Sequence, residues 1–138
     1  MKWYLMALKN YATFKGRARR KEYWMFVLFN MIFASIAMIL DNLLGLTFEV
    51  QGQSAGYGYL YLAYGLFAFI PGVSLLVRRL HDVNKSGWFY WIVLIPIVGA
   101  IWLIVLLVKE GTSGNNDYGQ DPKGDDSMNN EALDAHLA

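Results

Sequence analysis

A run of ionisable side chains at residues 78–82 is the part of this chain best suited to chemistry. It contains two arginines, one histidine and one aspartate, namely Arg78, Arg79, His81 and Asp82. Histidine titrates near neutral pH and could transfer protons, and the planar fork of arginine could hold the phosphate of a lipid head group. These four residues define one hypothesis, a membrane-embedded enzyme acting on lipid head groups.

Sequence spacing argues against that enzyme. Consecutive residues do not face each other on a helix, whereas residues four apart do, so we expect Arg78 to pair with Asp82 and His81 to lack that partner. The chain has no cysteine, and its second histidine, His136, lies far away in the tail. No suitable nucleophile accompanies His81. We therefore expect no catalytic residue, no metal site and no cofactor.

A second basic cluster precedes the first long apolar run. Such clusters either set topology alone or bind anionic lipid head groups, at about 1 kcal/mol per base near the surface. We expect no nucleic-acid binding, because nothing in the chain resembles a recognition motif. The candidate anion-binding residues of the two clusters are Arg17, Arg19, Arg20, Lys21, Arg78, Arg79 and Lys85.

Three long apolar runs must position these clusters. Residues 23–40, 57–77 and 88–108 contain no charged residue and no histidine. A helix needs roughly 20 apolar residues to cross a bilayer core, and backbone in lipid must be hydrogen-bonded internally. The sequence therefore predicts an all-α membrane protein with three transmembrane helices at about residues 23–44, 57–77 and 88–108.

The segments around these runs complete the expected domain. Apolar residues at helical spacing in residues 1–14 predict a short N-terminal helix, lying either at the membrane surface or against the protein itself. Residues 124–138 are acidic and polar, and we expect them to be a disordered tail. Residues 1–123 would then form a single transmembrane domain.

Uneven charge predicts the topology. Bases concentrate in residues 1–22 and 78–87, whereas residues 41–56 form a polar loop with two acids and no base. The positive-inside rule puts the basic segments in the cytoplasm, side by side at one depth, and the loop on the far side. Three spans would put the tail on the far side too. Pro96 and Gly99 leave an alternative, a hairpin that returns the tail, but one kinked span fits the length of the run better.

Three smaller features predict local contacts. Ser86 can cap a helix that begins beside it. Asn30 lies within an apolar run, where an amide usually bonds another helix. Ala68 and Gly72 are four residues apart and permit close helix packing.

Three motifs separated by the apolar runs lie in residues 16–24, 78–88 and 111–122, and they include Gly16, Tyr23, Trp24, His81, Asp82, Ser86, Gly87 and Trp88. In this order and spacing they resemble the DUF805 family of small YhaH-like bacterial inner-membrane proteins. The resemblance covers about residues 1–123 and implies a protein of the bacterial inner membrane, but it supplies no activity. Together with the charge pattern, we expect a multi-pass protein with a cytoplasmic N-terminus and, if three spans hold, a periplasmic tail.

The leading functional hypothesis is a small binding or accessory protein of the inner membrane. Its partners would be anionic lipids, a second copy of the chain or another membrane protein. A transporter or channel subunit formed by oligomerisation is the alternative, although proton-coupled transport usually requires an ionisable residue within the spans. The head-group enzyme is the third hypothesis.

Overall fold

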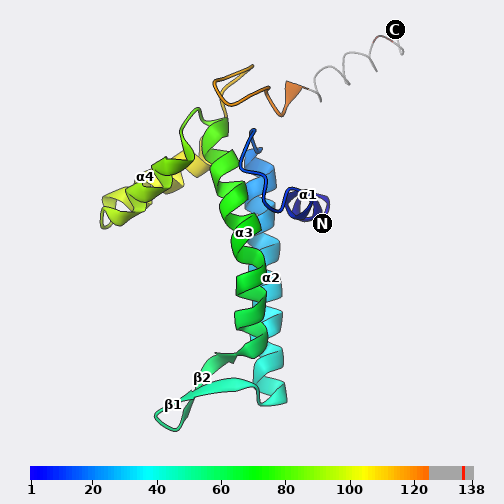
Figure 1. Ribbon diagram of the computed structural model, residues 1–138, viewed down its shortest axis with the longest axis vertical. Coiled ribbons are helices and arrows are strands. Elements are labelled where there is room, and N and C mark those ends of the chain that lie inside the picture. Colours follow the sequence, from blue (N-terminus) through cyan, green and yellow to red (C-terminus); the bar gives the residue numbers. More distant parts are fainter. Residues whose placement is uncertain (125–134, 136–138) are drawn as a thin grey trace.

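The computed structural model describes residues 1–124 and residue 135 (Figure 1). The rest of the acidic tail that we expect to be disordered lies outside the described residues. The elements follow one another as α1 (Lys2–Lys9), α2 (Arg20–Leu44), β1 (Thr47–Val50), β2 (Gln53–Gly58), α3 (Tyr59–Asp82), the 3-10 helix η1 (Gly87–Leu94) and α4 (Val98–Val108).

Helices α2 and α3 form a long antiparallel pair, which Figure 1 shows along its vertical axis. Both are long and apolar enough to cross a membrane, and only 6% and 22% of their most apolar windows are buried. A core helix of a soluble protein would hide far more of its apolar surface. Two of the three predicted apolar helices are therefore present.

Specific contacts hold this pair together as the sequence predicts. The Tyr64 hydroxyl of α3 donates a hydrogen bond to the Asn30 side-chain oxygen of α2 at 2.7 Å. Ala68 is buried, and a Cβ placed on Gly72 would lie 3.8 Å from the Phe26 ring. Small residues thus let the two backbones approach, and the polar pair links them within the apolar region.

Helix α1 packs against the protein rather than standing apart from it. The Tyr4 ring stacks on Phe26 of α2 with ring centroids 5.4 Å apart. The Ser74 hydroxyl of α3 donates to the carbonyl oxygens of Asn10 and Thr13, which follow α1. Of the two arrangements left open by the sequence, packing on the protein is the one observed.

The predicted polar loop at residues 41–56 contains a small antiparallel sheet. Strands β1 and β2 pair Glu49 with Ser54 and Val50 with Gln53. Gln51 and Gly52 between them both have positive φ angles, of 53° and 78°. Two consecutive residues with positive φ give the tight turn whose twist matches paired strands. The expectation of an all-α fold is therefore corrected by one short β-hairpin.

A buried carboxylate joins this hairpin to α3. Asp41, near the end of α2, is fully buried. It accepts hydrogen bonds from the backbone N–H groups of Gly58, Leu60 and Tyr61 at 3.0, 2.9 and 2.9 Å. The first N–H groups of a helix have no partner within the helix. Asp41 therefore caps α3 from a neighbouring helix.

We expect Asp41→Ala to lower the free energy of unfolding by about 2 kcal/mol, because it leaves three N–H groups of the α3 N-terminus without an acceptor. Thermal unfolding of the detergent-solubilised protein measures this loss. Glu49→Ala is the matched control, since Glu49 is an exposed acid of β1. Equal losses in both variants would refute the capping role.

The third apolar run is a hairpin, so the prediction of one kinked span was wrong. The chain leaves η1, turns through Pro96 and Ile97, whose φ is +64°, and returns as α4. A Cβ on Gly99 would overlap the Ile92 carbonyl oxygen of η1. Proline interrupts the helix, and glycine permits the close return. In Figure 1 this hairpin projects sideways from one end of the α2–α3 pair.

This return also overturns the predicted separation of the N-terminus and the tail. In the last turn of α4, the Leu107 carbonyl accepts a hydrogen bond from the Trp24 indole N–H of α2 at 3.2 Å. The Val108 carbonyl accepts one from Arg20 at 3.2 Å. The chain thus comes back to the end where α2 begins and α3 ends, and residues 109–124 lie with the N-terminal basic segment.

Candidate functional site

Three segments distant in sequence meet at one end of the α2–α3 pair. We call this the polar end, formed by residues 15–22, 78–87 and 109–123. The Ala18 N–H donates to the Arg78 carbonyl oxygen at 3.0 Å, which ties the first two segments together. The two basic clusters therefore lie side by side, as their positions relative to the apolar runs predict.

Buried ion pairs organise the polar end. Asp82 pairs with Arg17 at 3.0 Å and with Arg79, and the three side chains are only 4%, 1% and 0% exposed. Arg78 pairs with Glu22 of α2 at 3.0 Å. The predicted Arg78–Asp82 pair was wrong, because Arg78 faces α2 while Asp82 faces Arg17. Charges this deeply buried require such partners.

The same arginines fasten the segment that follows α4. Arg17 donates to the carbonyl oxygens of Gly114, at 2.6 Å, and of Thr112. Arg79 donates to the carbonyl oxygens of Leu107, at 3.2 Å, and Lys109. A guanidinium offers five donors in a fixed fork, so one arginine can serve a carboxylate and several carbonyls at once. We call residues 109–123 the strap.

An aspartate shapes the strap itself. The Asp121 carboxylate accepts from the backbone N–H groups of Lys123, at 3.0 Å, and Gly114, at 2.9 Å. Hydrogen bonds from these donors hold the pKa of Asp121 below its usual range. The ionised carboxylate therefore supports the strap at neutral pH, and this support is lost as the pH falls through that lowered pKa.

His81 has a packing role. One ring nitrogen, Nδ1, lies 2.9 Å from the Gly16 carbonyl oxygen. The ring stacks on Tyr118 of the strap, with centroids 4.1 Å apart and planes 4° from parallel. The His81 carbonyl also accepts from the Asn116 amide at 2.9 Å. This histidine thus joins the N-terminal segment, α3 and the strap.

The remaining candidate bases lie nearer the surface. Arg20, Lys21 and Lys85 are exposed. Arg19 is partly buried and donates to the Pro122 carbonyl oxygen of the strap at 2.8 Å. The seven candidate bases therefore comprise three buried arginines (Arg17, Arg78 and Arg79), the partly buried Arg19, and three exposed bases.

Three other residues singled out from the sequence, Ser86, Gly87 and Tyr23, have structural roles. The Ser86 hydroxyl accepts from the Trp88 N–H at 3.3 Å, which confirms the predicted cap at the start of η1. A Cβ on Gly87 would lie 2.8 Å from the Val77 side chain. Half-buried Tyr23 packs among the leucines of α3 and α4. Trp88 is 77% exposed.

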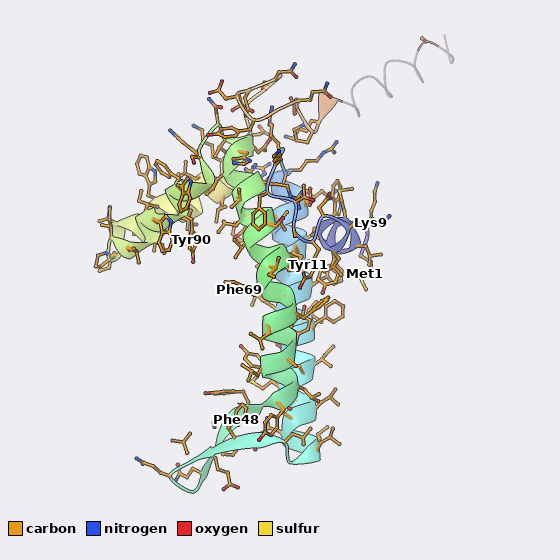
Figure 2. The ribbon with its side chains drawn as sticks, viewed as in Figure 1. Met1, Lys9, Tyr11, Phe48, Phe69 and Tyr90 are labelled. Carbon is orange, nitrogen blue, oxygen red and sulfur yellow. The ribbon has the colours of Figure 1, made fainter. Side chains whose placement is uncertain are left out.

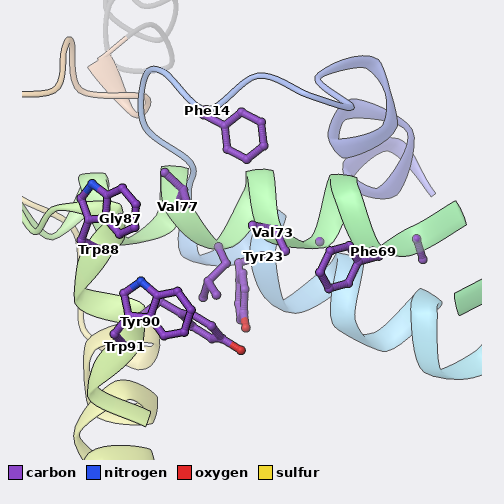
Figure 3. A pocket seen from close by; sticks show the side chains of 12 residues that line it. Phe14, Tyr23, Phe69, Val73, Val77, Gly87, Trp88, Tyr90 and Trp91 are labelled. Atoms are coloured by element: carbon purple, nitrogen blue, oxygen red, sulfur yellow. The ribbon is translucent and has the colours of Figure 1, made fainter. Parts of the chain in front are cut away.

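Several hollows lie at this end, and two of them concern the candidate site. The first, of about 480 Å³, is polar and is lined by residues of α1, of the basic segment and of α3. The second, of about 680 Å³, is an apolar groove between α3 and η1. Figure 3 shows Phe69 and Val73 of α3 near Tyr23, with Tyr90 and Trp91 of η1 across from them.

Sequence reasoning missed Trp3 as a member of the site. Its ring lies within 5.6–5.8 Å of the cationic groups of Lys2, Arg19 and Lys21. Cations over an indole face are attracted by its quadrupole. The aromatic residues of the first 14 positions signal an amphipathic helix, but nothing in the sequence indicates that α1 packs beside the basic cluster.

Comparison with known proteins identifies clear relatives. The family described as "Protein of unknown function (DUF805)" matches residues 11–120. "Inner membrane protein YhaH" of Escherichia coli (strain K12) is 46% identical over 123 residues, covering 89% of this chain and 98% of that protein. "Inner membrane protein YhaI" of the same strain is also 46% identical over 123 residues, covering 89% and 97%.

A more distant relative extends the comparison. "Uncharacterized protein YiiR" of Escherichia coli (strain K12) is 27% identical over 134 residues, covering 79% of this chain and 85% of that protein. No solved structure matches the chain.

Proposed function

Because the chain belongs to the DUF805 family, we propose that it is an inner-membrane protein whose polar end binds anionic phospholipid head groups. One observation carries this proposal. Exposed bases lie at the start of α2 and just before η1, and exposed tryptophans lie in α2, η1 and α4. The η1–α4 hairpin projects sideways from this end of the molecule (Figure 2). Indole rings favour the membrane–water interface, and bases there attract anionic lipids.

In this proposal α2 and α3 cross the bilayer and the η1–α4 hairpin enters only one leaflet. Helix α4 has 11 residues and is about 16 Å long, whereas the hydrocarbon core is about 30 Å thick. Ile97, at the turn, is 76% exposed and lies near the middle of the uncharged residues 88–108. Exposed apolar side chains of this kind are stabilised in lipid.

The proposed orientation follows from the charges. The polar end carries most of the bases, so the positive-inside rule assigns it to the cytoplasmic face. The β1–β2 hairpin at the opposite end then faces the periplasm. Both ends of the described chain, including the strap, would be cytoplasmic.

Three exposed bases supply the head-group contacts, and the apolar groove accepts an acyl chain. Arg20 and Lys21 lie at the start of α2, where Arg20 contacts the end of α4, and Lys85 lies just before η1. The groove between α3 and η1 is lined mainly by apolar and aromatic side chains, which suits a lipid tail. A phospholipid offers an anionic head group for the bases and an acyl chain for the groove.

The structure favours this binding role over the alternatives. His81 stacks on Tyr118, lies against the Gly16 carbonyl and is only 9% exposed, so a head-group enzyme would have little access to its ring. An oligomeric transporter or channel subunit stays the alternative hypothesis.

A triple variant tests the proposal. Arg20→Gln/Lys21→Gln/Lys85→Gln removes three bases worth about 1 kcal/mol each, so we expect retention of phosphatidylglycerol to fall roughly a hundredfold. Native mass spectrometry of the protein from mixed phosphatidylglycerol–phosphatidylcholine nanodiscs measures this retention. The charge-preserving variant Arg20→Lys/Lys21→Arg/Lys85→Arg is the control and should behave like the wild type. Unchanged retention in the glutamine variant would refute the proposal.

A further inference from the structure

Arg78 is a buried arginine in which two of the three guanidinium nitrogens have no hydrogen-bond partner among the described residues. Its side chain is 5% exposed, and its Nη1 donates to Glu22 Oε1 at 3.0 Å. Its Nε and Nη2 are buried and have no hydrogen-bond partner among the described residues. Buried polar groups in native proteins are nearly always satisfied. An arginine held in place with two open donors is therefore a feature that requires explanation.

The two open donors form one recognition edge. The N–H groups of Nε and Nη2 point in the same direction along one side of the planar guanidinium. Two parallel donors in this arrangement match two oxygens of a phosphate or a carboxylate. Glu22 occupies the other end of the group, so it fixes the guanidinium without closing this edge.

The hollow beside Arg78 has the charge that an anion requires. Its volume is about 480 Å³, and its lining includes Lys2, Lys15, Arg17 and Arg19 in addition to Arg78. Glu22 is the single acid in the lining, and it is already paired with Arg78. Arg17 is likewise paired with Asp82. The exposed ammonium groups of Lys2 and Lys15 thus leave the hollow positive.

We propose that this hollow is a phosphate-binding site, in which Arg78 holds two oxygens of one phosphate group and Lys2 and Lys15 neutralise its charge. The inference rests on the proposed function, because a site at head-group level makes an anionic phospholipid the expected source of the phosphate. Free inorganic phosphate has the same chemistry and is separated from the lipid by the test below.

Entry to the site requires a small movement. The two open nitrogen atoms have almost no solvent-exposed surface, so an anion must displace part of the wall to reach them. Lys2 and Lys15 line the hollow and are both exposed, so their long flexible side chains can adjust to a phosphate that enters it.

Two variants separate this site from general attraction by the basic surface. Lys2→Gln/Lys15→Gln removes two lysines of the hollow. Lys9→Gln/Lys109→Gln removes two exposed lysines outside it and is the matched control. Arg78→Lys keeps a positive charge beside Glu22 but removes the fork. Delipidated protein in neutral detergent is titrated with phosphatidylglycerol, with phosphatidylcholine as the reference lipid and inorganic phosphate as competitor, by native mass spectrometry and by the shift in unfolding temperature.

We expect phosphatidylglycerol to bind Lys2→Gln/Lys15→Gln and Arg78→Lys about tenfold more weakly than wild type, as the loss of a charge-assisted hydrogen bond implies. The control should stay within about twofold. Inorganic phosphate should compete. If phosphate binds and phosphatidylglycerol neither binds nor competes, the site is supported with free phosphate as its source.

Two results would overturn the site. One is an equal loss in Lys2→Gln/Lys15→Gln and in the control, which would indicate diffuse attraction. The other is wild-type binding by Arg78→Lys, which would show that the fork is not used. Both results leave the proposed function standing. That function fails separately if the Arg20, Lys21 and Lys85 triple variant retains phosphatidylglycerol normally.

Discussion

Asp82→Asn is expected to lower the free energy of unfolding by about 3–5 kcal/mol, the usual cost of removing one partner from a buried ion pair. Asp82 is the shared partner of Arg17 and Arg79, and both arginines are almost completely buried. An asparagine leaves two buried positive charges without a carboxylate. Thermal unfolding and size-exclusion chromatography of the detergent-solubilised protein should show a large loss of stable, monodisperse material.

Two further variants make this prediction specific. Asp117→Asn removes an exposed acid of the strap and should leave stability within about 0.5 kcal/mol of wild type. Gly111→Ala keeps every charge, but its Cβ would overlap the Asp82 carboxylate, so it should reproduce part of the loss. An Asp82→Asn protein as stable as Asp117→Asn would show that the ion pairs do not support the fold.

Single-cysteine labelling should place Ser86 and Ser113 on the same side of the membrane. These residues bracket the η1–α4 hairpin, so a hairpin in one leaflet returns the chain to the side from which it entered. The chain has no native cysteine, so each introduced thiol reports alone. In intact spheroplasts an impermeant reagent should label Ser54→Cys in β2, and should label Ser86→Cys and Ser113→Cys only after permeabilisation.

The turn of the hairpin gives a further readout. Ile97→Cys should resist aqueous reagents before and after permeabilisation, because the proposal places it in lipid. Labelling of Ser86→Cys and Ser113→Cys from opposite sides would show that residues 88–108 cross the membrane as a single third span. Labelling of Ile97→Cys as readily as Ser54→Cys would place the hairpin in water.

Helices α2 and α3 could be predicted because a membrane-spanning helix is the structure that best fits apolar runs of their length. The sequence of residues 88–108 did not decide between a single span and a hairpin in the same way. An uncharged run of one bilayer thickness has the same composition whether it crosses the membrane or turns within it. The outcome depends on the turn at Pro96 and on the close approach of Gly99 to η1, which the order of residues along the sequence does not reveal.

The ion pairs show the same limit. Spacing along a helix favours Arg78 with Asp82, but spacing ignores partners from other segments. Arg78 instead meets Glu22, and Asp82 meets Arg17, in both cases across more than 50 positions of sequence. The sequence identifies the charged residues of the polar end, whereas packing of α1, α2 and α3 decides which charge meets which.

The strap has a consequence for biosynthesis. Arg17 and Arg79 are made early, yet several of the carbonyl groups that satisfy them belong to residues 107–114. A ribosome must therefore translate past the η1–α4 hairpin before these guanidinium groups can leave water. Until then the N-terminal segment and the end of α3 remain hydrated. The final assembly of this part of the protein is thus a late step, completed when the strap closes over the N-terminal segment.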